Sequence, residues 1–439
     1  MRTGELGGGF IGLSFPSSEL NSGSFSYTGN LPALLRNLGP GVLRFGGSSV
    51  DRASFTGIWR RPARALATLV RRTGWNVLYS VNLGHFQASQ VTADARRVAA
   101  DLGAHLLAIA CGNEPELFAG RYRPADYDEA DYLSDDVPRC LQAVRQGAPS
   151  ARFAGPDTFE VAGGPGDWST PWLPPYASAA QAGQIPGLSL LVAHLYPMSN
   201  CFNFGQGVQP ADLLSPAVEE KERGVLAAIG SAAATAGVPY LISESNSASC
   251  GGIPGVSNSY ASALWSADWL MLAAERDARG LDFNGALSSA CPLYSPLCGA
   301  GPGMYSARPV YYGMLFVHML GTGRTFFTPL TISGAADAHV VTHSVVSSSG
   351  RVRVMVENLG AVSMRVLLQD SRISGRADTW YLTGPSVGAT GGVRIQGATV
   401  RRNGTFRPGA PGHVTCRAGS CRLNLPAYSA VIVQLPKRV

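Results

Sequence analysis

The feature that most constrains this chain is the alternation of short apolar runs with helical patterns between residues 9 and 319. The apolar runs are rich in Val, Leu and Ile, as is typical of strands buried on both faces. They cover residues 9–15, 41–45, 76–82, 105–110, 151–155, 188–196, 238–243 and 281–286. Helical patterns stand between most of them, at residues 61–72, 92–102, 125–146, 215–236, 257–279 and 307–320. Strand and helix repeated about eight times predict an α/β fold, a (β/α)8 or TIM barrel.

The pattern changes near residue 322, where short β-type runs separated by Gly, Ser, Asn and Asp replace the alternation. These runs cover residues 326–332, 339–347, 351–357, 362–369, 379–382, 392–400, 413–416 and 427–435. Closely spaced strands with turn signals predict a β-sandwich. A chain of 439 residues is also long for one domain. We therefore expect a catalytic barrel over residues 1–320 and a C-terminal β-sandwich domain over 321–439, with a packed interface because no linker separates them.

Signals for cofactors and metals are missing from the sequence. Gly7-Gly8-Gly9 has neither the spacing nor the downstream acidic residue of a dinucleotide-binding turn, which argues against a doubly wound sheet. No G-K-[ST] follows a Gly-rich turn, and neither C-x-x-C nor H-E-x-x-H occurs. We expect no cofactor and no metal.

Charge and hydropathy narrow the possible partners. The net charge of +6 comes almost wholly from arginine, and its small size permits an acidic ligand without requiring one. No basic run is interleaved with aromatics, so nucleic acid is not expected as a partner. No apolar run is long enough to span a bilayer, so no membrane partner is expected either. The oligomeric state is not predicted by the sequence.

Eight cysteines favour disulfides and an oxidising compartment. Cys416 and Cys421 flank a turn, Cys291 and Cys298 flank a Pro-rich loop, and Cys201 and Cys250 each follow a predicted strand and could meet above a pocket. Cys111, at a strand end, and Cys140, on a helix, are expected to be free. A sequon, Asn403-Gly404-Thr405, agrees with a secreted, extracellular protein. No signal peptide stands at Met1, so we expect the leader to have been trimmed or left out.

Two glutamates follow predicted barrel strands. Asn113-Glu114-Pro115 comes soon after the run at 105–110, and Glu244 comes directly after the run at 238–243. Catalytic groups of TIM barrels lie at the carboxyl ends of the strands, and two facing carboxylates are the minimum needed to break a glycosidic bond. The alternatives are an ordinary helix start at Glu114, and a helix N-cap or a salt bridge at Glu244.

Residues at the ends of four predicted strands, or in the loops that follow them, are also candidates for contacts with a substrate. His194 and Tyr196 end one predicted strand and share a face. Asp51 follows another strand, and the small residues of Cys250-Gly251-Gly252 can bring main-chain N–H groups close to an anion. Tyr294 lies in the loop after the last barrel strand. Each also has a plain explanation: packing at a strand end, a turn aspartate or a loop aromatic.

The whole chain resembles glycoside hydrolase family 79, the β-glucuronidase and heparanase-like group of retaining glycosidases. The resemblance rests on segments that follow the predicted strands in the order of that family. They are Leu43-Arg44-Phe45-Gly46-Gly47 with Asp51, Gly112-Asn113-Glu114-Pro115, His194-Leu195-Tyr196, Glu244-Ser245-Asn246-Ser247 with Cys250-Gly251-Gly252, and Ala307-Arg308-Pro309 with Tyr311-Tyr312-Gly313.

The resemblance implies the role of each residue. Glu114 would be the acid/base and Glu244 the nucleophile. Asn113 would bind the 2-hydroxyl of the sugar, and Tyr196 would contact the nucleophile. The remaining positions would bind the rest of the terminal sugar: Asp51 its hydroxyls, and Cys250, Gly251 and Tyr294 the uronate carboxylate. The substrate would be a glycan or glycoside containing glucuronic acid, with or without a 4-O-methyl group.

The family pattern and the residues leave several alternatives open. Members commonly begin with a strand that completes the β-sandwich, and we expect this chain to lack most of it. An endo-acting, heparanase-like enzyme is one rival, although no Lys/Arg cluster flanks the motifs. A neutral-sugar glycosidase of the same clan is a second, and a non-catalytic carbohydrate-binding protein is a third. A retaining enzyme predicts the two carboxyl groups roughly 5–5.5 Å apart.

Overall fold

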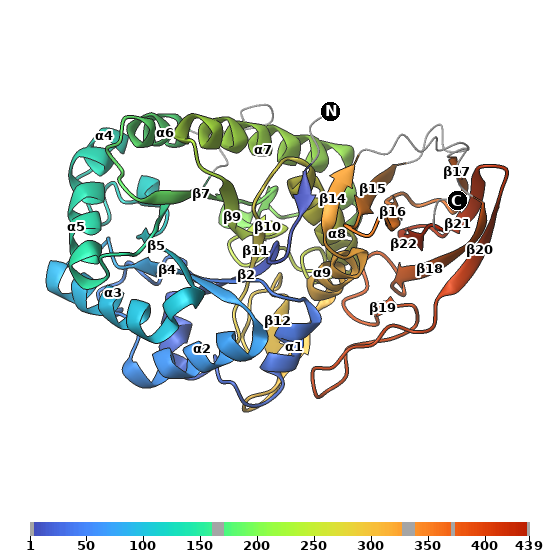
Figure 1. Ribbon diagram of the computed structural model, residues 1–439, viewed down its shortest axis with the longest axis horizontal. Helices are drawn as coiled ribbons and strands as arrows, with labels where there is room; N and C mark the ends of the chain where they lie inside the picture. The colour runs from blue at the N-terminus through green and yellow to red at the C-terminus, as the bar shows by residue number, and fades with distance from the viewer. Residues whose placement is uncertain (1–3, 160–170, 327–338, 370–373, 437–439) are drawn as a thin grey trace.

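Eight parallel strands close into a barrel at one end of the molecule, as the alternating sequence pattern predicts (Figure 1). The computed structural model describes residues 4–159, 171–326, 339–369 and 374–436. In barrel order after β11 (Leu281–Asn284), the strands are β2 (Ile11–Pro16), β3 (Val42–Gly46), β4 (Asn76–Val81), β5 (Leu106–Cys111), β6 (Phe153–Phe159), β7 (Leu188–Leu195) and β9 (Tyr240–Ser245). Pairing of β11 with both β2 and β9 closes the ring.

Helices connect successive strands around the outside of the barrel (Figure 1). They are α1 (Leu31–Asn37), α2 (Arg60–Thr73), α3 (Ala88–Leu102), α4 (Glu129–Asp131), α5 (Val137–Gly147), α6 (Leu173–Gln181), α7 (Pro216–Ala236), α8 (Tyr260–Glu275) and α9 (Pro309–Leu320). In the predicted helix at 125–146, one turn of π-helix joins α4 to α5. The pattern did not predict α1 and α6, which are short and begin with proline in their first turn.

The packing of α2 shows why the sequence forms these elements. Its buried side chains include Ala63, Leu66, Ala67 and Val70, spaced so that they share one face of a helix. Gly74 ends the helix in the left-handed conformation, with a φ of 77°, which glycine adopts without a steric penalty.

The interior of the barrel changes from apolar to polar along the strands. An inner cluster of buried side chains comes from six of the strands and consists of Val42, Leu78, Ala108, Ala110, Ala154, Leu190, Val192 and Leu241. Two residues further along, β3 places Arg44 inside the barrel and β7 places His194 there, both fully buried. The polar end is therefore the carboxyl end of the strands.

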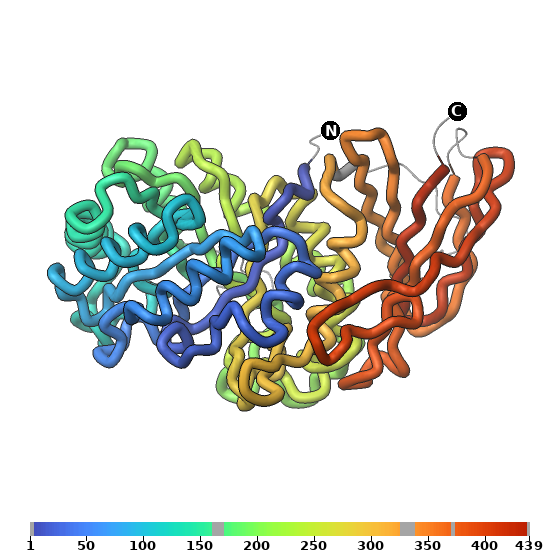
Figure 2. Tube along the Cα trace, turned by 60° about the horizontal axis from the view of Figure 1, so that its bottom comes forward, coloured from blue at the N-terminus to red at the C-terminus, as the bar shows by residue number. Residues whose placement is uncertain are grey.

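An antiparallel sheet of ten strands packs beside the barrel and holds both ends of the described chain (Figure 2). Its order is β1 (Glu5–Leu6), β14 (Gly323–Phe326), β15 (Val340–Val346), β16 (Val352–Asn358), β22 (Ser429–Gln434), β18 (Gly375–Thr383), β20 (Gly412–Arg417), β21 (Ser420–Leu425) and β17 (Met364–Gln369), with β19 (Arg394–Ile395) paired to β18.

Most predicted strands of this region are present. The prediction missed β21, and only two residues of the run at 392–400 form a strand. Most of the run at 326–332 lies outside the described residues. In the family that the chain resembles, the first strand completes the β-sandwich, and we expect this chain to lack most of that strand. In the structure, β1 supplies two residues at this place, which pair with β14.

The central strands of the sheet, β16 and β22, bury both of their faces. Val354 and Val356 of β16 and Val431 and Val433 of β22 belong to an inner cluster of the sandwich. The alternate residues of the same strands, such as Met355, join the large core that also contains α8 and α9. Figure 1 shows these two helices between the barrel and the sheet. The division into domains at residue 320 stays a prediction.

Four two- or three-residue strands form small sheets beside the barrel: β8 (Met198–Ser199) with β10 (Ala248–Ser249), and β12 (Leu297–Gly299) with β13 (Tyr305–Ala307). In the described part of the chain, no helix has the length and apolar character needed to cross a membrane.

Candidate active site

The two predicted glutamates meet at the polar end of the barrel. Glu114 follows β5 in a left-handed conformation, with φ 51° and ψ 60°, and its main-chain N–H donates to the carbonyl oxygen of Asp157, 2.9 Å away. Glu244 lies on β9. One carboxylate oxygen of each glutamate and one ring nitrogen of His194 all lie within 4.8 Å of one another. The two carboxyl groups therefore face the same space at the carboxyl end of the barrel strands.

Glu244 is held from both oxygens. Its Oε2 accepts from Nη1 of Arg44 at 2.5 Å, and its Oε1 accepts from the Tyr196 hydroxyl at 2.7 Å. The amide nitrogen of Asn284 lies 3.0 Å from the same Oε1. A carboxylate that accepts several hydrogen bonds, one of them from a guanidinium, is stabilised in its ionised form. The predicted contact between Tyr196 and Glu244 is thus present.

Arg44 is the centre of the network, and sequence reasoning did not assign it a role. Its Nη2 donates to Oδ1 of Asn113 at 2.6 Å and to Oδ2 of Asp157 at 2.5 Å. The side chain is fully buried, and the nearby carboxylates of Asp157 and Glu244 raise its pKa despite burial. A Cβ at Gly46 would meet this guanidinium at 2.4 Å, so glycine makes room for it.

Asp157 and His194 extend the network toward Glu114. Asp157 is fully buried, and Arg44 lowers its pKa well below the usual value, against the effect of burial. Burial disfavours protonation of His194, but the carboxylates of Asp157 and Glu244 outweigh it and raise the pKa of the imidazole to about 10. His194 therefore carries a positive charge near neutral pH.

Glu114 is the more accessible of the two glutamates. Its side chain is 19% exposed, compared with 9% for Glu244. Its Oε1 lies 2.9 Å from Nδ1 of His194, an N–H donor in the charged ring. Among the described residues, Oε2 of Glu114 has no hydrogen-bond partner. Together with Ser48, Asp51 and Asn113, Glu114 lines a small hollow at the protein surface.

Asn113 and Asp51 lie beside Glu114. Because Oδ1 of Asn113 accepts from Arg44, the amide nitrogen is left free to donate. Asp51 is 1% exposed, and its carboxylate accepts the main-chain N–H groups of Leu83, Gly84 and Asn113 at 2.8–2.9 Å. Burial raises the pKa of Asp51 to about 7, against the effect of these donors. Asp51 thus fixes the segment that carries Asn113.

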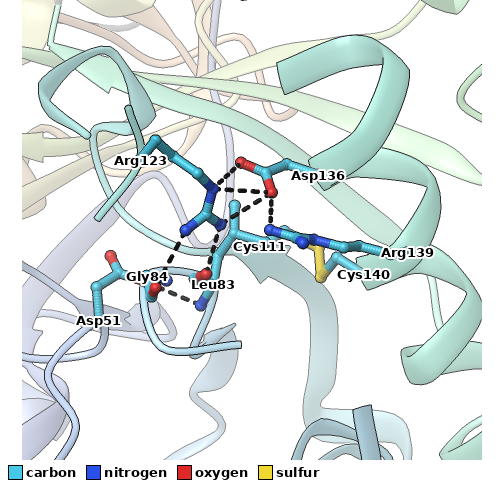
Figure 3. Close-up of a disulfide and its surroundings, with 8 residues drawn as sticks. All are labelled: Asp51, Leu83, Gly84, Cys111, Arg123, Asp136, Arg139 and Cys140. Atoms are coloured by element: carbon cyan, nitrogen blue, oxygen red, sulfur yellow. Dashed lines mark hydrogen bonds and ion pairs between the residues drawn. A yellow bond between two sulfur atoms is a disulfide. The ribbon is translucent and has the colours of Figure 1, made fainter. Parts of the chain in front are cut away.

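Figure 3 shows what supports this segment from outside the site. Arg123 donates to the carbonyl oxygens of Leu83 and Gly84, at 2.9 and 3.2 Å, and pairs with Asp136 at 2.9 Å. Asp136 also pairs with Arg139 of α5. The ion pairs therefore connect α5 to the loop that binds Asp51.

The cysteines of the site are all in disulfides. Cys111, at the end of β5, is bonded to Cys140 of α5, which corrects the expectation that both are free (Figure 3). The two residues lie 29 positions apart, on a strand and on the helix that packs outside it, so no local spacing signals the bond. The other disulfides are Cys201–Cys250, whose two cysteines the sequence indicated could meet, and Cys291–Cys298 and Cys416–Cys421, which close the loop and the turn that these cysteines flank.

The predicted carboxylate-binding residues are connected to Glu244 through Asn284, whose amide nitrogen lies near both Glu244 and Tyr294. Cys250, Gly251 and Gly252 follow one another with φ values of 55°, 88° and 90°, which turns the main chain sharply. Gly251 accepts a hydrogen bond from the N–H of Leu293, which precedes Tyr294. The Tyr294 hydroxyl lies 3.1 Å from the amide nitrogen of Asn284. The structure thus brings the loop at Gly251 and Tyr294 together beside Glu244.

Sequence reasoning missed Arg44, Asp157 and Asn284 as parts of the site. The signal for Arg44 is a charge inside an apolar strand, since an unpaired buried charge would be very unfavourable. Asn284 lies within the predicted last strand, with only its position to mark it. Asp157 lies two residues beyond the predicted strand at 151–155, because β6 continues to Phe159.

The chain is similar to known proteins over part of its sequence and in its fold. A scan of protein-family models finds no match to the chain. A curated β-glucuronidase of Aspergillus niger is 29% identical over 125 residues, which are 28% of this chain and 23% of that protein. The match thus spans less than a quarter of the relative's length.

Solved structures match the chain over nearly its whole length. A 4-O-α-L-rhamnosyl-β-D-glucuronidase of Fusarium oxysporum, solved with Rha-GlcA, has a TM-score of 0.75 at 18% identity, covering 99% of this chain and 97% of that one. A family 51 α-L-arabinofuranosidase of Bifidobacterium longum has a TM-score of 0.68 at 12% identity, covering 99% and 97%. At such identities these matches show the fold alone, a (β/α)8 barrel with an attached antiparallel sheet.

Proposed function

We propose that this protein is a retaining exo-β-glucuronidase, which releases terminal β-linked glucuronic acid from glycans or glycosides. The names of the Aspergillus and Fusarium proteins support the sugar, because both are β-glucuronidases. The pair of glutamates at the carboxyl end of the barrel supports the reaction. The observation that carries the proposal is the different surroundings of these two glutamates.

The hydrogen bonds distinguish the nucleophile from the acid. Glu244 receives three donors, one of them charged, and we therefore assign the role of nucleophile to this glutamate. Two cations, Arg44 and His194, already balance the charges of Glu244 and Asp157. We assign the acid role to Glu114, because it is the more exposed of the two glutamates and its Oε2 has no hydrogen-bond partner among the described residues.

The reaction then proceeds in two displacements. Glu244 attacks the anomeric carbon while Glu114 gives its proton to the departing glycosidic oxygen. Formation of the glycosyl ester removes the charge of Glu244, which favours ionisation of Glu114. Ionised Glu114 takes a proton from water, and the water oxygen attacks the anomeric carbon. Glucuronic acid leaves with retained configuration, and Glu244 is again a carboxylate.

The neighbouring residues would orient the sugar. The free amide N–H of Asn113 would donate to the 2-hydroxyl, next to the anomeric carbon. The main-chain N–H groups of Cys250 and Gly251, with the Tyr294 hydroxyl, would bind the uronate carboxylate, since consecutive N–H groups in a tight turn favour an anion. Asp51 would act mainly by fixing the main chain at Asn113, whose N–H it accepts. Its carboxylate would also face the sugar hydroxyls.

Four disulfides also support an extracellular location, because such bonds persist in oxidising compartments. We propose that the protein acts outside the cell on a substrate containing glucuronic acid.

The test is an assay of purified protein on 4-nitrophenyl β-D-glucuronide and the matched β-D-glucoside. We expect hydrolysis of the glucuronide, weak or absent hydrolysis of the glucoside, and loss of activity in Glu244→Gln. Glu220→Gln, which makes the same change on the exposed side of α7, is the control and should keep its activity.

Other outcomes would change the proposal. Cleavage of the glucoside instead would remove the role of Gly251 and Tyr294 in binding a carboxylate. Cleavage of a glucuronate-containing polymer but not of the aryl glycoside would favour an endo-acting enzyme. If folded protein with both glutamates present hydrolyses none of these substrates, a non-catalytic carbohydrate-binding protein would be favoured.

A further inference from the structure

Three ionisable side chains meet between the barrel and the sheet, apart from the candidate active site. Asp268 comes from α8, His343 from β15 and Glu357 from β16, and one possible ligand atom of each lies within 4.8 Å of the other two. All three are buried, with exposed fractions of 5%, 3% and 0%. Buried carboxylates are unfavourable unless a positive charge or hydrogen-bond donors compensate them.

The strand register explains how they come together. His343 of β15 is paired with Met355 of β16, so His343, Met355 and Glu357 point to the same face of the sheet. Met355 packs into the core that contains α8, which shows that this face is turned toward the helix. Asp268 and Glu275 lie two turns apart on α8 and both reach His343.

His343 is oriented as metal-binding histidines usually are. Its Nδ1 lies 2.8 Å from a carboxylate oxygen of Glu275, and its Nε2 lies 2.7 Å from Oδ1 of Asp268. A carboxylate on one ring nitrogen fixes the tautomer and turns the other nitrogen toward a metal ion. Ligand atoms in a tetrahedral zinc site are roughly 3.3 Å apart, so Asp268 and His343 need to separate by only a fraction of an ångström.

Glu357 supplies the second observation. Both of its carboxylate oxygens are buried, and neither has a hydrogen-bond partner in the described structure. A divalent cation bound by two carboxylates and a neutral imidazole forms an electrically neutral unit. Such a cation would therefore satisfy Glu357 and Asp268 together, which no protein donor does for Glu357 here.

A small hollow reaches the group from one side. It is lined by Asp268 together with Glu219, Glu222 and His339, and its volume of about 10 Å³ is close to that needed for one water molecule. One water molecule has space there beside Asp268 and could serve as a fourth ligand.

We propose that Asp268, His343 and Glu357 bind a divalent metal ion of the zinc class, which ties α8 to the sheet as a structural site. The mixture of one imidazole and two carboxylates suits zinc better than calcium or magnesium, which prefer oxygen ligands alone. No local sequence spacing marks such a site, because its ligands come from three distant elements. This inference does not depend on the proposed glucuronidase activity.

The experiment uses the full chain carrying Glu244→Gln, because Glu114, His194 and Glu244 form a second group that could take up the ion. The protein is freed of metal with a chelator and titrated with Zn²⁺, with Mg²⁺ as the control for ionic strength. We expect one equivalent of Zn²⁺ to bind and to raise Tm by about 3 °C at a hundredfold excess over Kd.

Two further variants locate the ion. Glu357→Gln should abolish both zinc uptake and the shift in Tm, whereas Asp94→Asn, which changes a buried carboxyl group bonded to the Tyr79 hydroxyl outside the proposed site, should keep both. Absence of stoichiometric uptake, or equal uptake by Glu357→Gln, would overturn the proposal.

A measurement on the parent protein covers the case in which Glu357→Gln does not fold. Crystals of the Glu244→Gln protein soaked with Zn²⁺ should give an anomalous difference peak at the zinc edge between Asp268, His343 and Glu357. A map without a peak at this position would equally overturn the proposal.

Discussion

At the scale of single residues, Arg44 determines the geometry of the site. Its guanidinium touches Glu244, Asn113 and Asp157 at once, so it aligns the proposed nucleophile with the residue beside the acid. Only a planar, branched group can reach these partners in fixed directions.

Arg44→Lys should therefore lower kcat by about 10²- to 10³-fold, because a single ammonium group cannot hold the same partners. The free energy of unfolding should also fall by a few kcal/mol, since one of the buried carboxylates loses its counter-ion. Kinetics and denaturant unfolding measure the two effects. Arg64→Lys, on the exposed side of α2, is the control, and equal behaviour of the two variants would contradict the role of Arg44.

His194 gives a prediction about pH. Its pKa is raised from 6.5 to about 10 in the folded protein, so the charged form is favoured by folding. The resulting stabilisation is complete below about pH 6.5 and is lost as the pH rises toward 10. The difference in unfolding free energy between wild type and His194→Gln should thus shrink over this interval. The raised pKa of His194 would be contradicted by a difference in unfolding free energy that does not change with pH. An imidazole NMR titration centred near pH 6.5 would contradict it equally.

Sequence reasoning found those site residues that follow strands and carry chemistry, such as Glu114 and Glu244. It did not find Arg44 or Asn284, because their roles depend on partners from other strands that only the closed barrel brings within reach. The site is therefore predictable at the level of strand ends but not at the level of the network inside the barrel.

At the scale of elements, a disulfide and an ion pair hold the chain after β5 against the outer helical segment that contains α5. The Cys111–Cys140 disulfide joins β5 to α5 only three residues before Glu114. Arg123 and Asp136 strengthen the same connection.

Removing this disulfide with Cys111→Ala and Cys140→Ala should lower the free energy of unfolding by roughly 3–4 kcal/mol in the chain-entropy description. The matched pair Cys416→Ala and Cys421→Ala should lower it by roughly 2 kcal/mol, because it closes a shorter loop in the sequence. Denaturant unfolding of both double variants measures the difference. A larger loss for the pair at 416 and 421 would contradict the expectation.

The main elements were predictable where their hydrophobic patterns are long. Helices such as α2 and α7 match their predicted ranges to within one residue. Short elements such as α1 and β21 were missed, since tertiary contacts rather than local pattern stabilise them.

At the scale of the whole molecule, the barrel and the sheet share one core. The apolar residues of α8 and α9 pack on one side against the barrel and on the other against the sheet. The Tyr260 hydroxyl of α8 also donates to the carbonyl oxygen of Leu382 in β18, 2.8 Å away.

We expect the protein to unfold in one cooperative transition, although its length is typical of two domains. Ile432→Ala, which truncates a buried side chain of the sheet on the face turned to the barrel, should lower the single Tm through a loss of roughly 2–5 kcal/mol. Differential scanning calorimetry tests both points. Two separate transitions, with only one shifted by the substitution, would show that the barrel and the sheet are independent.

The most direct test of the proposed chemistry is the stereochemistry of the first product. Proton NMR during hydrolysis of an aryl β-D-glucuronide distinguishes the two anomers of free glucuronic acid before they equilibrate. The arrangement of Glu114 and Glu244 predicts the β-anomer as the first product, with the α-anomer appearing later by mutarotation. Release of the α-anomer first would show a single displacement by water and would contradict the role of Glu244 as nucleophile.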